Sequence, residues 1–457
     1  MGVFGSSLLG FLVAIAILVA VHEFGHYLVA RWCGVRVLRF SIGFGPVLLR
    51  WMGKRSVFRG SEFVLSALPL GGYVRMLDSR DAELASELVR TPEAAFDRQT
   101  LWKRSLIVAA GPLANFLLAF VLYSGALAMP DRDLAPVVAT PAANTPAYAA
   151  GVRGGMRILR VDGREVAHWG DIRWLLLARV FDDTLEVDVD DGGIERSFAL
   201  QRSPSSSLTP EAIGARLAGW GLSFDQPAQV GTVKAGGPAA RAGLETGDRV
   251  LSVDGRAVRQ WSELTRAIQA APEVALNFVI ERGGTRESVV VTPRADTLAG
   301  QRIGRIDIAA AAPDTLAPGS IVNRSRSVGE ALEAGALRTF DATVLTVRVL
   351  WGMVSGEISL RQVSGPIAMA EGAGATLQQG AVAFTLFLAI VSISLGVLNL
   401  LPVPMLDGGQ LLYHFFEAIK GAPLSDTAQA VGQRVGIGFV IALTALALYN
   451  DILRILS

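Results

Sequence analysis

The sequence predicts a polytopic α-helical membrane protein with four transmembrane helices and, outside the membrane, two copies of an α/β domain. Mean hydropathy is +0.42, and 51% of the 457 residues are hydrophobic, whereas the 18% that are charged leave room for soluble parts. Residues 131 to about 375 contain no apolar run long enough to span a bilayer. A net charge of +1 gives no reason to expect a nucleic-acid partner.

The first apolar run, Val3–Val21, is interpreted as a retained transmembrane helix that continues to about Ala30. No Lys or Arg precedes Arg31, so the positive segment of a signal peptide is missing. Basic residues follow the run, which places the N-terminus outside and the end of the helix at the cytoplasmic face. The single cysteine, Cys33, excludes an intramolecular disulfide and is interpreted as a packed thiol.

His22, Glu23 and His26 form a His-Glu-x-x-His motif at the end of this run. On a helix the two histidines lie one turn apart on one face, where they can share a zinc ion, and Glu23 can act as the base. The alternative is a chance pattern, which we reject because the chain has only four histidines. The apolar neighbours of the motif predict a metal site inside the membrane.

Two glycine-rich segments, 40–46 and 63–74, are too short to span as helices and are expected to form strands of a membrane-associated β-hairpin region. Such strands must lie against protein or line a wet cavity if they enter the membrane. They are either a sheet edge that pairs with an extended substrate or a plain cytoplasmic hairpin. The charged segment 78–103 is expected to be a cytoplasmic loop.

A second span is predicted at Leu106–Met129, and it contains Asn115. An asparagine inside a span should face the protein interior, where it either bonds a neighbouring helix or orients a metal ligand. A third span, Gly380–Leu401, ends in a segment with Pro402 and Pro404, which cannot continue a hydrogen-bonded helix.

Asp407 follows this break, within Asp-Gly-Gly. That tripeptide alone is a common turn. Its position at the end of a span, in a chain that also carries His-Glu-x-x-His, favours a metal ligand. His414 is expected to be interfacial. The last apolar run, Val435–Tyr449, is short, and we count it as a fourth span because Arg434 and Arg454 can reach the interfaces.

The segment 131–312 carries an internal repeat: residues 150–164 reappear as 242–256. Each copy predicts a strand, a Val-Asp-Gly turn, an amphipathic helix and further strands. The copies resemble tandem PDZ domains of the type found in bacterial proteases, which implies binding of a C-terminal peptide at a sheet edge or exclusion of bulky substrates. The first copy is looser, with Met156 where the second has Asp248. His168 aligns with Gln260 and is expected to be exposed.

The motifs at His22–His26, Gly111–Asn115 and Asn399–Gly408, on three spans with the PDZ-like pair between the second and third, resemble the site-2 protease family of intramembrane metalloproteases. The resemblance covers essentially the whole chain. It implies that His22, His26 and Asp407 ligate one Zn²⁺ per chain. Glu23 is then the proton acceptor, and Asn399 either donates to the oxyanion or holds the broken helix end. Ser394 departs from an asparagine that many family members carry.

The family also implies a single-span membrane protein as substrate, locally extended and already cut on its outer side, with an anti-sigma factor and remnant signal peptides as the candidate partners. The PDZ-like pair would enforce that order from the periplasmic side of a bacterial inner membrane, with the active site toward the cytoplasm. Candidate substrate-binding residues are Asn115, Gly43, Gly72 and Pro402.

The expected domains run in chain order: the first transmembrane helix (1–34), the β region with a cytoplasmic loop (35–104), the second transmembrane helix (105–130), the PDZ-like domains (131–225 and 226–312), an amphipathic helical region (313–379), the third transmembrane helix (380–410), and a loop with the fourth (411–457). Residues 328–354 would lie on the outer membrane surface or brace the PDZ-like pair. Two other function classes are alternatives: a membrane-anchored PDZ peptide-binding module with a vestigial metal site, and a metal-dependent transporter, for which an inverted repeat is missing.

Overall fold

The computed structural model divides into two compact units, residues 1–129 with 326–457, and residues 130–325. The residues that it describes are 3–54, 58–79, 89, 91–202, 216–224, 226–258, 260–298, 301–311 and 321–456. Residues 80–88 and 90 of the expected loop at 78–103 therefore lie outside the described residues. The boundaries expected at 225 and 312 fall on undescribed residues as well.

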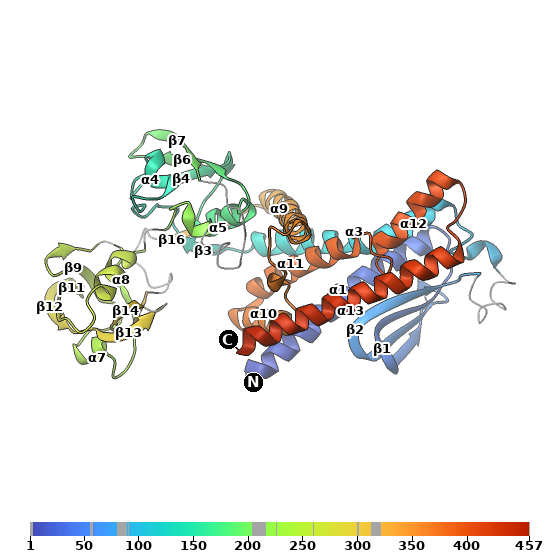
Figure 1. Cartoon of the computed structure of the whole chain (residues 1–457), viewed down its shortest axis with the longest axis horizontal. Coiled ribbons are helices and arrows are strands. Elements are labelled where there is room, and N and C mark those ends of the chain that lie inside the picture. The colour runs from blue at the N-terminus through green and yellow to red at the C-terminus, as the bar shows by residue number, and fades with distance from the viewer. Residues whose placement is uncertain are drawn as a thin grey trace. The chain divides into compact units, whose positions relative to one another are not determined.

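The first unit is a bundle of apolar helices (Figure 1). Among the described residues, four helices are long and apolar enough to cross a membrane, as the sequence predicts. The bundle is built by α1 (Val3–Trp32), α3 (Leu101–Ala128), α9 (Val328–Ser355), α10 (Pro366–Gln379), α11 (Ala381–Asn399), α12 (Asp407–Lys420) and α13 (Asp426–Leu456), with the short 3₁₀ helices η3 (Pro92–Ala94) and η5 (Leu360–Gln362).

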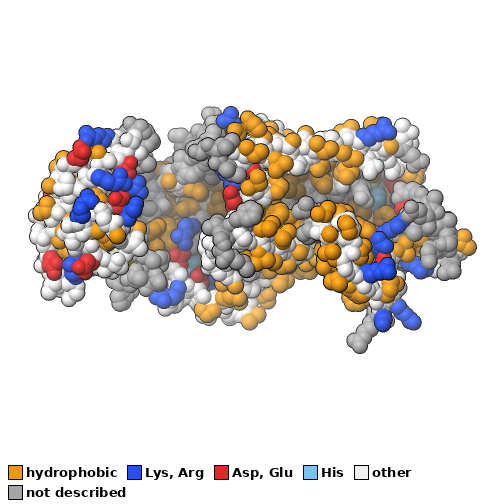
Figure 2. Space-filling view, turned by 90° about the horizontal axis from the view of Figure 1, so that it is seen from below, with side chains coloured by type: hydrophobic (Ala, Val, Ile, Leu, Met, Phe, Trp, Pro, Cys, Tyr) orange, Lys and Arg blue, Asp and Glu red, His pale blue; other side chains and the backbone are white. Residues whose placement is uncertain are grey.

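The outer surface of this bundle is apolar. Figure 2 shows hydrophobic side chains dominating the viewed face over the helices. Large side chains such as Leu117, Val121 and Ile441 are more than half exposed. A continuous apolar surface of this kind in water would drive association, so it is the surface that a bilayer covers. The chain is accordingly a membrane protein.

Two long strands, β1 (Val37–Met52) and β2 (Glu62–Met76), form an antiparallel sheet beside α1. Residues 39–42 of β1 pair with 72–75 of β2 on one side and with 62–65 on the other, and residues 47–52 of β1 pair with 62–66. The bent strands therefore make a four-stranded ribbon. No described strand pairs with the outer side of Gly72–Met76, so this segment is an edge.

The second unit contains the two repeated domains, each built on a four-stranded antiparallel sheet of the same order. The first sheet runs β5-β4-β6-β7 and the second β10-β9-β11-β12. The first domain has α4 (Pro146–Ala150), β4 (Arg157–Val161), β5 (Arg164–Glu165), α5 (Trp169–Ala178), β6 (Thr184–Asp190) and β7 (Glu195–Gln201).

The second domain repeats this order with β8 (Val230–Val233), α7 (Pro238–Arg241), β9 (Arg249–Val253), β10 (Arg256–Ala257), α8 (Trp261–Gln269), β11 (Leu276–Arg282) and β12 (Thr285–Val291). Both Val-Asp-Gly turns form, and Asp162 and Asp254 take a positive φ of 46° and 50°. The remaining strands form pairs: β13 (Arg294–Leu298) with β14 (Gln301–Arg305), β15 (Ile308–Ala310) with β8, and β16 (Ile321–Arg324) with β3 (Asp131–Leu134).

The difference between Met156 and Asp248 has a local explanation. Asp248 is 1% exposed, accepts a hydrogen bond from Glu245 N at 2.8 Å, and pairs with both arms of Arg282. Met156 Sδ takes the equivalent place, 3.3 Å from Arg153 N, and its side chain packs in the apolar core of the first domain. At the same turn, the first domain therefore has a hydrophobic contact of Met156 where the second domain has the ion pair of Asp248 with Arg282.

The expectation that His168 is exposed is wrong, because the residue is only 3% exposed. His168 is the N-cap of α5, and its Nδ1 accepts from Asp171 N. Its Nε2 lies 3.1 Å from Asp131 Oδ2, on the strand that begins the unit. The aligned Gln260 is the N-cap of α8 and is also buried. An N-cap turns its side chain toward the helix, which the alignment did not reveal.

The fourth span is longer than the sequence indicates, since α13 covers Asp426–Leu456 and the span within it covers Thr427–Arg454. This span includes Asp451, a charged residue that lowers the hydropathy of the segment and normally disfavours membrane insertion. Asp451 is 2% exposed and accepts hydrogen bonds from the N–H groups of Gly365, Ile367 and Ala368 at 2.9–3.1 Å. The carboxylate caps α10 from another helix, so its charge meets a helix N-terminus instead of lipid.

This cap yields a prediction for stability. Asp451→Ala should lower the free energy of unfolding by about 1–3 kcal/mol, because three N–H groups at the start of α10 lose a buried charged acceptor. Thermal unfolding of the protein in detergent, followed by circular dichroism, measures the effect. Arg454→Ala, one turn away, removes the half-exposed pair with Glu371 and a longer contact of 3.9 Å with Asp451, but leaves the three N–H bonds of the cap in place. It should change stability by less than about 1 kcal/mol. Equal losses in both variants would contradict the capping role.

Candidate metal centre

Helix α1 presents His22 and His26 one turn apart, and both are nearly buried, with 8% and 9% exposure. Their rings meet edge to face with centroids 4.8 Å apart. They lie directly over α3 because Gly111 has no side chain: a Cβ there would collide with the rings of both histidines. Gly25 gives the same close approach from α1, against Ala110 and Ala114.

Helix α3 also fixes the orientation of the two rings. His26 Nδ1–H donates to the carbonyl oxygen of Ile107 at 2.8 Å, which leaves Nε2 with a free lone pair. The Nδ1 of His22 lies 3.1 Å from the amide of Asn115, a residue that is fully buried. Each histidine therefore has its Nδ1 held by α3 and its Nε2 turned to the same point.

Asp407 comes to this point from the other end of the sequence. After α11 the chain is irregular through Pro402 and Pro404, and α12 begins at Asp407. Gly408 and Gly409 lie against the carbonyl oxygens of this irregular segment, so a Cβ at either position would collide with backbone. The two glycines let the first turn of α12 fold against the break, and this brings the Asp407 carboxylate to the histidines.

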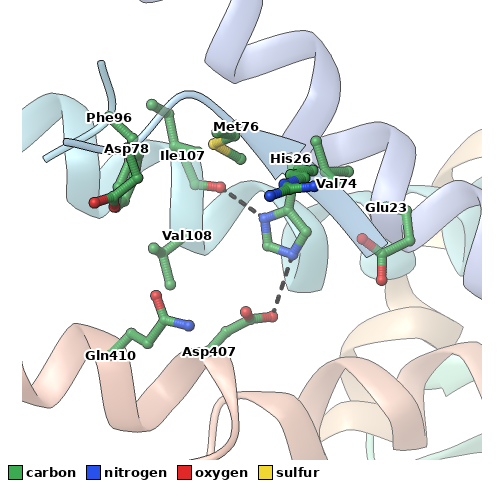
Figure 3. Close-up of a pocket in the computed structure, with 11 residues that line it drawn as sticks. Glu23, His26, Val74, Met76, Asp78, Phe96, Ile107, Val108, Asp407 and Gln410 are labelled. Atoms are coloured by element: carbon green, nitrogen blue, oxygen red, sulfur yellow. Dashed lines mark hydrogen bonds and ion pairs between the residues drawn. The ribbon is translucent and has the colours of Figure 1, made fainter. Parts of the chain in front are cut away.

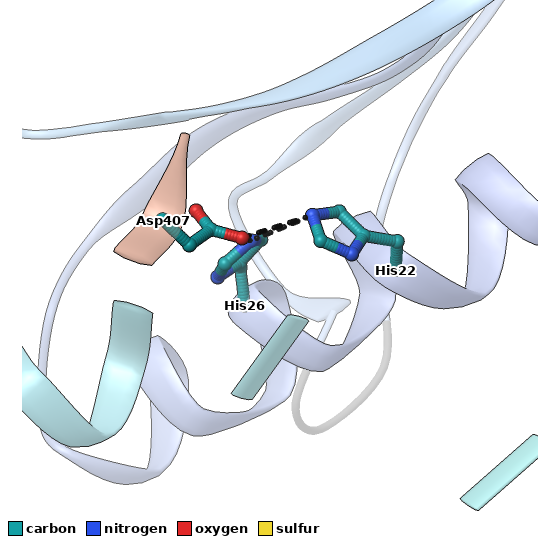
Figure 4. Close-up of side chains that lie close together, drawn as sticks. All are labelled: His22, His26 and Asp407. Carbon is teal, nitrogen blue, oxygen red and sulfur yellow. Dashed lines mark hydrogen bonds and ion pairs between the residues drawn. The ribbon is translucent and has the colours of Figure 1, made fainter. Parts of the chain in front are cut away.

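Three ligand atoms converge in a way that fits zinc. Asp407 Oδ2 lies 3.2 Å from His22 Nε2 and 3.5 Å from His26 Nε2, and the two Nε2 atoms are 3.2 Å apart (Figure 4). Zinc bonds of about 2.0–2.2 Å in a tetrahedral site set ligand atoms about 3.3–3.6 Å apart. Among the described residues, these three form the one such group of His, Cys, Asp and Glu side chains.

The hydrogen bonding of the group supports the same fit. No described residue gives the buried Oδ2 of Asp407 a well-directed hydrogen bond, and Oδ1 of Asn115 is also buried without a partner. A metal on Nε2 of His22 requires the ring proton on Nδ1, and the amide oxygen of Asn115 can accept that proton after a half-turn of the amide. A bound cation would thus satisfy Oδ2 of Asp407 directly and Oδ1 of Asn115 through the ring proton of His22.

A cavity of about 390 Å³ opens beside this group. Glu23, His26 and Asp407 line it, together with residues 74–76 of the β2 edge (Figure 3). Figure 3 shows the Glu23 carboxylate on the side of α1 that faces β2, with Asp407 and Gln410 across the cavity on α12. The cavity thus connects a possible metal, a carboxylate base and a strand edge.

The other predicted site residues lie around this cavity in different ways. Asn115 lies behind His22, and Asn399 is the last residue of α11; neither is among the described residues that line the cavity. Gly72 lies beside Glu23, since a Cβ there would come within 3.0 Å of Glu23 Cγ. Gly43 has a positive φ of 88° at the bend of β1, and Pro402 lies in the break before α12.

Sequence reasoning missed the cavity residues Arg75, Met76, Asp78, Phe96 and Gln410 and the carbonyl group of Ile107. Gln410 had a usable signal, because it lies three residues after Asp407 and therefore on the same face of a helix. The carbonyl group of Ile107 had none, since every residue carries one.

Comparison with known proteins agrees with this geometry. The sequence profile described as peptidase family M50 matches residues 10–443. The regulator of sigma-E protease RseP of Escherichia coli (strain K12) is 35% identical over 460 residues, which cover 98% of both chains. The protease RseP of Yersinia pestis is 35% identical over 458 residues, covering 98% of this chain and 99% of the relative.

Among solved structures, the PDZ domain of an SdrC-like protein from Listeria monocytogenes is 23% identical with a TM-score of 0.17, covering 20% of this chain and 90% of that one. The family match and the full-length relatives, not this short similarity, decide the assignment. The chain belongs to peptidase family M50 and is an intramembrane zinc metalloprotease of the site-2 type.

Proposed function

We propose that His22, His26 and Asp407 hold one zinc ion per chain and that Glu23 is the general base of peptide hydrolysis. The observation that carries this proposal is the convergence of three ligand atoms 3.2–3.5 Å apart on the wall of a cavity that Glu23 also lines. A vestigial site in a pure binding module would have no reason to keep all four side chains together.

The chemistry follows from these positions. Zinc, when bound, supplies Lewis-acid activation of the attacking water and of the scissile carbonyl group. Glu23 accepts a proton from that water and delivers it to the leaving nitrogen. His26 and His22 keep their orientation through Ile107 and Asn115 on α3. Asn399 is the proposed donor to the developing oxyanion, and its alternative role is to hold the end of α11.

The substrate class that suits the cavity is a single-span membrane protein whose transmembrane helix is locally extended. A peptide bond in a helix is covered by its own turn, so hydrolysis requires extended backbone. Residues 74–76 of the β2 edge form part of the cavity wall, and the edge at Gly72–Met76 can pair with a substrate strand. Gly72 would then bring that strand close to Glu23, because an added Cβ at this residue would already lie 3.0 Å from Glu23 Cγ.

The relatives named as regulators of sigma-E protease suggest the partner class. We infer that the substrates are anti-sigma factors of the single-span type and remnant signal peptides, cut in the inner membrane. The orientation that follows from the basic residues after α1 puts the metal centre toward the cytoplasm and residues 131–325 in the periplasm.

The two repeated domains of residues 131–312 are proposed to be PDZ domains that admit only substrates already trimmed outside. Their common strand order and the paired Val-Asp-Gly turns support this. Capture of a C-terminal peptide is the other role that a PDZ edge allows. Cleavage of one substrate with and without a folded outer domain separates the two, because only a size filter predicts slower cleavage of the bulky form.

Removal of the Glu23 carboxylate should abolish peptide cleavage, whereas zinc should remain bound. Glu23→Gln is expected to lower the rate of cleavage of a model membrane-helix substrate about 10²–10⁴-fold. Zinc content, measured by mass spectrometry of the purified protein, should stay at one ion per chain, because Glu23 is not a ligand. Cleavage that persists in this variant and also in the presence of a zinc chelator would contradict the proposed mechanism.

The orientation of His22 should depend on Asn115. Asn115→Ala is expected to weaken zinc binding about 10–100-fold, because the ring loses the partner of its Nδ1–H. Asn115→Asp keeps an acceptor at that position and should retain more of the affinity. The measurement is competition with a fluorescent zinc chelator, and equal affinities in Asn115→Ala and the unmodified protein would remove Asn115 from the site.

The strand edge should contact substrate directly. A photo-crosslinking amino acid at Arg75, which lines the cavity, is expected to capture a single-span substrate in membranes when the chain also carries Glu23→Gln. The matched control is the same probe at Leu49, which is 60% exposed on the opposite edge of the ribbon. Equal capture at both positions would mean that the Gly72–Met76 edge has no special part in binding.

A further inference from the structure

Helix α3 holds two of the three proposed ligands directly, through the carbonyl group of Ile107 and the amide of Asn115. The third, Asp407, has no such partner on its own carboxylate among the described residues. It stands at the first residue of α12, directly after an irregular segment with two prolines. Its position is therefore set by the position of α12 as a whole, and the question is what fixes that helix.

The cytoplasmic end of α3 supplies two contacts to α12. Arg104 Nη2 and Nη1 donate to Glu417 Oε1 and Oε2 at 2.5 and 3.2 Å, and both side chains are about one-sixth exposed. The Ser105 hydroxyl donates to Leu101 O, so it accepts the Nδ1–H of His414 at 3.1 Å. His414 is 9% exposed, and its contact with Ser105 is partly buried between the two helices. Its interfacial depth in the membrane stays a prediction.

These contacts share one stripe of α12 with the ligand. Asp407, Gln410, His414 and Glu417 are spaced by three, four and three residues, so they fall on one face of the helix. The first two line the cavity, and the last two bind α3. Glu417 lies ten residues after Asp407, about 15 Å along the axis, so a small rotation or shift at the anchored end moves the carboxylate at the other.

A bidentate Arg–carboxylate pair suits this task because it fixes direction as well as distance. Arg104 has further support, since its Nε donates to Gln99 O at 3.2 Å and the guanidinium is thereby oriented before it meets Glu417. Burial and the neighbouring Arg104 lower the pKa of His414, so this imidazole is neutral at neutral pH and adds a directed hydrogen bond without a second buried charge.

We propose that Arg104 and Glu417, with Ser105 and His414, are positioning residues for zinc binding: they fix α12 on α3 so that the Asp407 carboxylate meets His22 and His26. The inference rests on the proposed ligand role of Asp407. Helix α3 would then position all three ligands, through Arg104–Ser105, Ile107 and Asn115, which lie within about three turns of that helix.

The test measures metal affinity and ligand geometry, not only activity. In the full-length protein, Glu417→Gln and Arg104→Lys should each weaken zinc binding about 10–100-fold, as loss of outer partners of a metal site does. The visible absorption spectrum of the cobalt-substituted protein should change, because the angle of the Asp407 carboxylate changes. The kcat should fall with little change in KM, since the strand edge is untouched.

Controls separate positioning from general stability. The exchange Arg104→Glu with Glu417→Arg retains the pair and should recover part of the affinity lost in the single variants. Arg454→Ala breaks another Arg–Glu pair of the same unit and should leave zinc affinity and the cobalt spectrum unchanged. Unaltered affinity and spectrum in Glu417→Gln, or an equal loss in Arg454→Ala, would overturn the inference.

Asp407→Ala distinguishes this failure from failure of the proposed function. If Asp407→Ala loses zinc while Glu417→Gln binds it normally, Asp407 is a ligand and only the positioning role is refuted. If Asp407→Ala retains zinc with full affinity, the ligand set itself is wrong, and the positioning role falls with it.

Discussion

The structure of the first unit depends on holding three lone pairs close together: those of His22 Nε2, His26 Nε2 and Asp407 Oδ2, which lie 3.2–3.5 Å apart. Two neutral imidazole nitrogens and a carboxylate oxygen repel at that separation in a buried site, unless a metal cation or a proton lies between them. The surrounding structure must therefore hold them together before the ion arrives, and the ion repays that cost when it binds. This explains why α3 contacts the histidines only at their Nδ1 atoms and contacts α12 away from Asp407. The two Nε2 atoms and Asp407 Oδ2 then remain available to the metal.

Helices in a membrane are not driven together by the hydrophobic effect, so close contact has to come from small residues and directed polar bonds. Gly25 and Gly111 bring α1 onto α3 until the histidine rings lie against the α3 backbone. Arg104 and Glu417 bring α12 onto the same helix. At the other end of the bundle Asp451 caps α10, and Gly10 of α1 packs against Ala373 of that helix. Polar contacts at both ends thus fix a bundle whose lipid-facing surface contributes little to specificity.

Local patterns predicted what depends on short-range geometry. His22 and His26 could be placed on one face from their spacing alone, and the proline break made Asp407 a ligand candidate. Positions set by distant partners could not be predicted. The capping of α10 by Asp451 joins residues more than 80 positions apart, so hydropathy made the fourth span too short. His168 was judged exposed from its alignment with Gln260, but both residues are helix N-caps, and both side chains are buried. The pair of Arg104 and Glu417 spans 313 positions.

The contact between Gly72 and Glu23 limits how a substrate can be held. A Cβ at residue 72 would meet Glu23 Cγ at 3.0 Å and Val19 Cγ1 at 2.9 Å, so the strand edge lies as close to α1 as backbone can. Neighbouring strands in a sheet are about 4.8 Å apart. A substrate strand added to that edge would therefore lie one strand spacing beyond Gly72, next to the cavity that Glu23 and Asp407 line. A side chain at residue 72 would also meet Ser41 O of the neighbouring strand segment at 2.7 Å. Both the pairing within the ribbon and its close approach to α1 therefore require a glycine at this place, and under the proposed function a larger residue would move the scissile bond relative to the base.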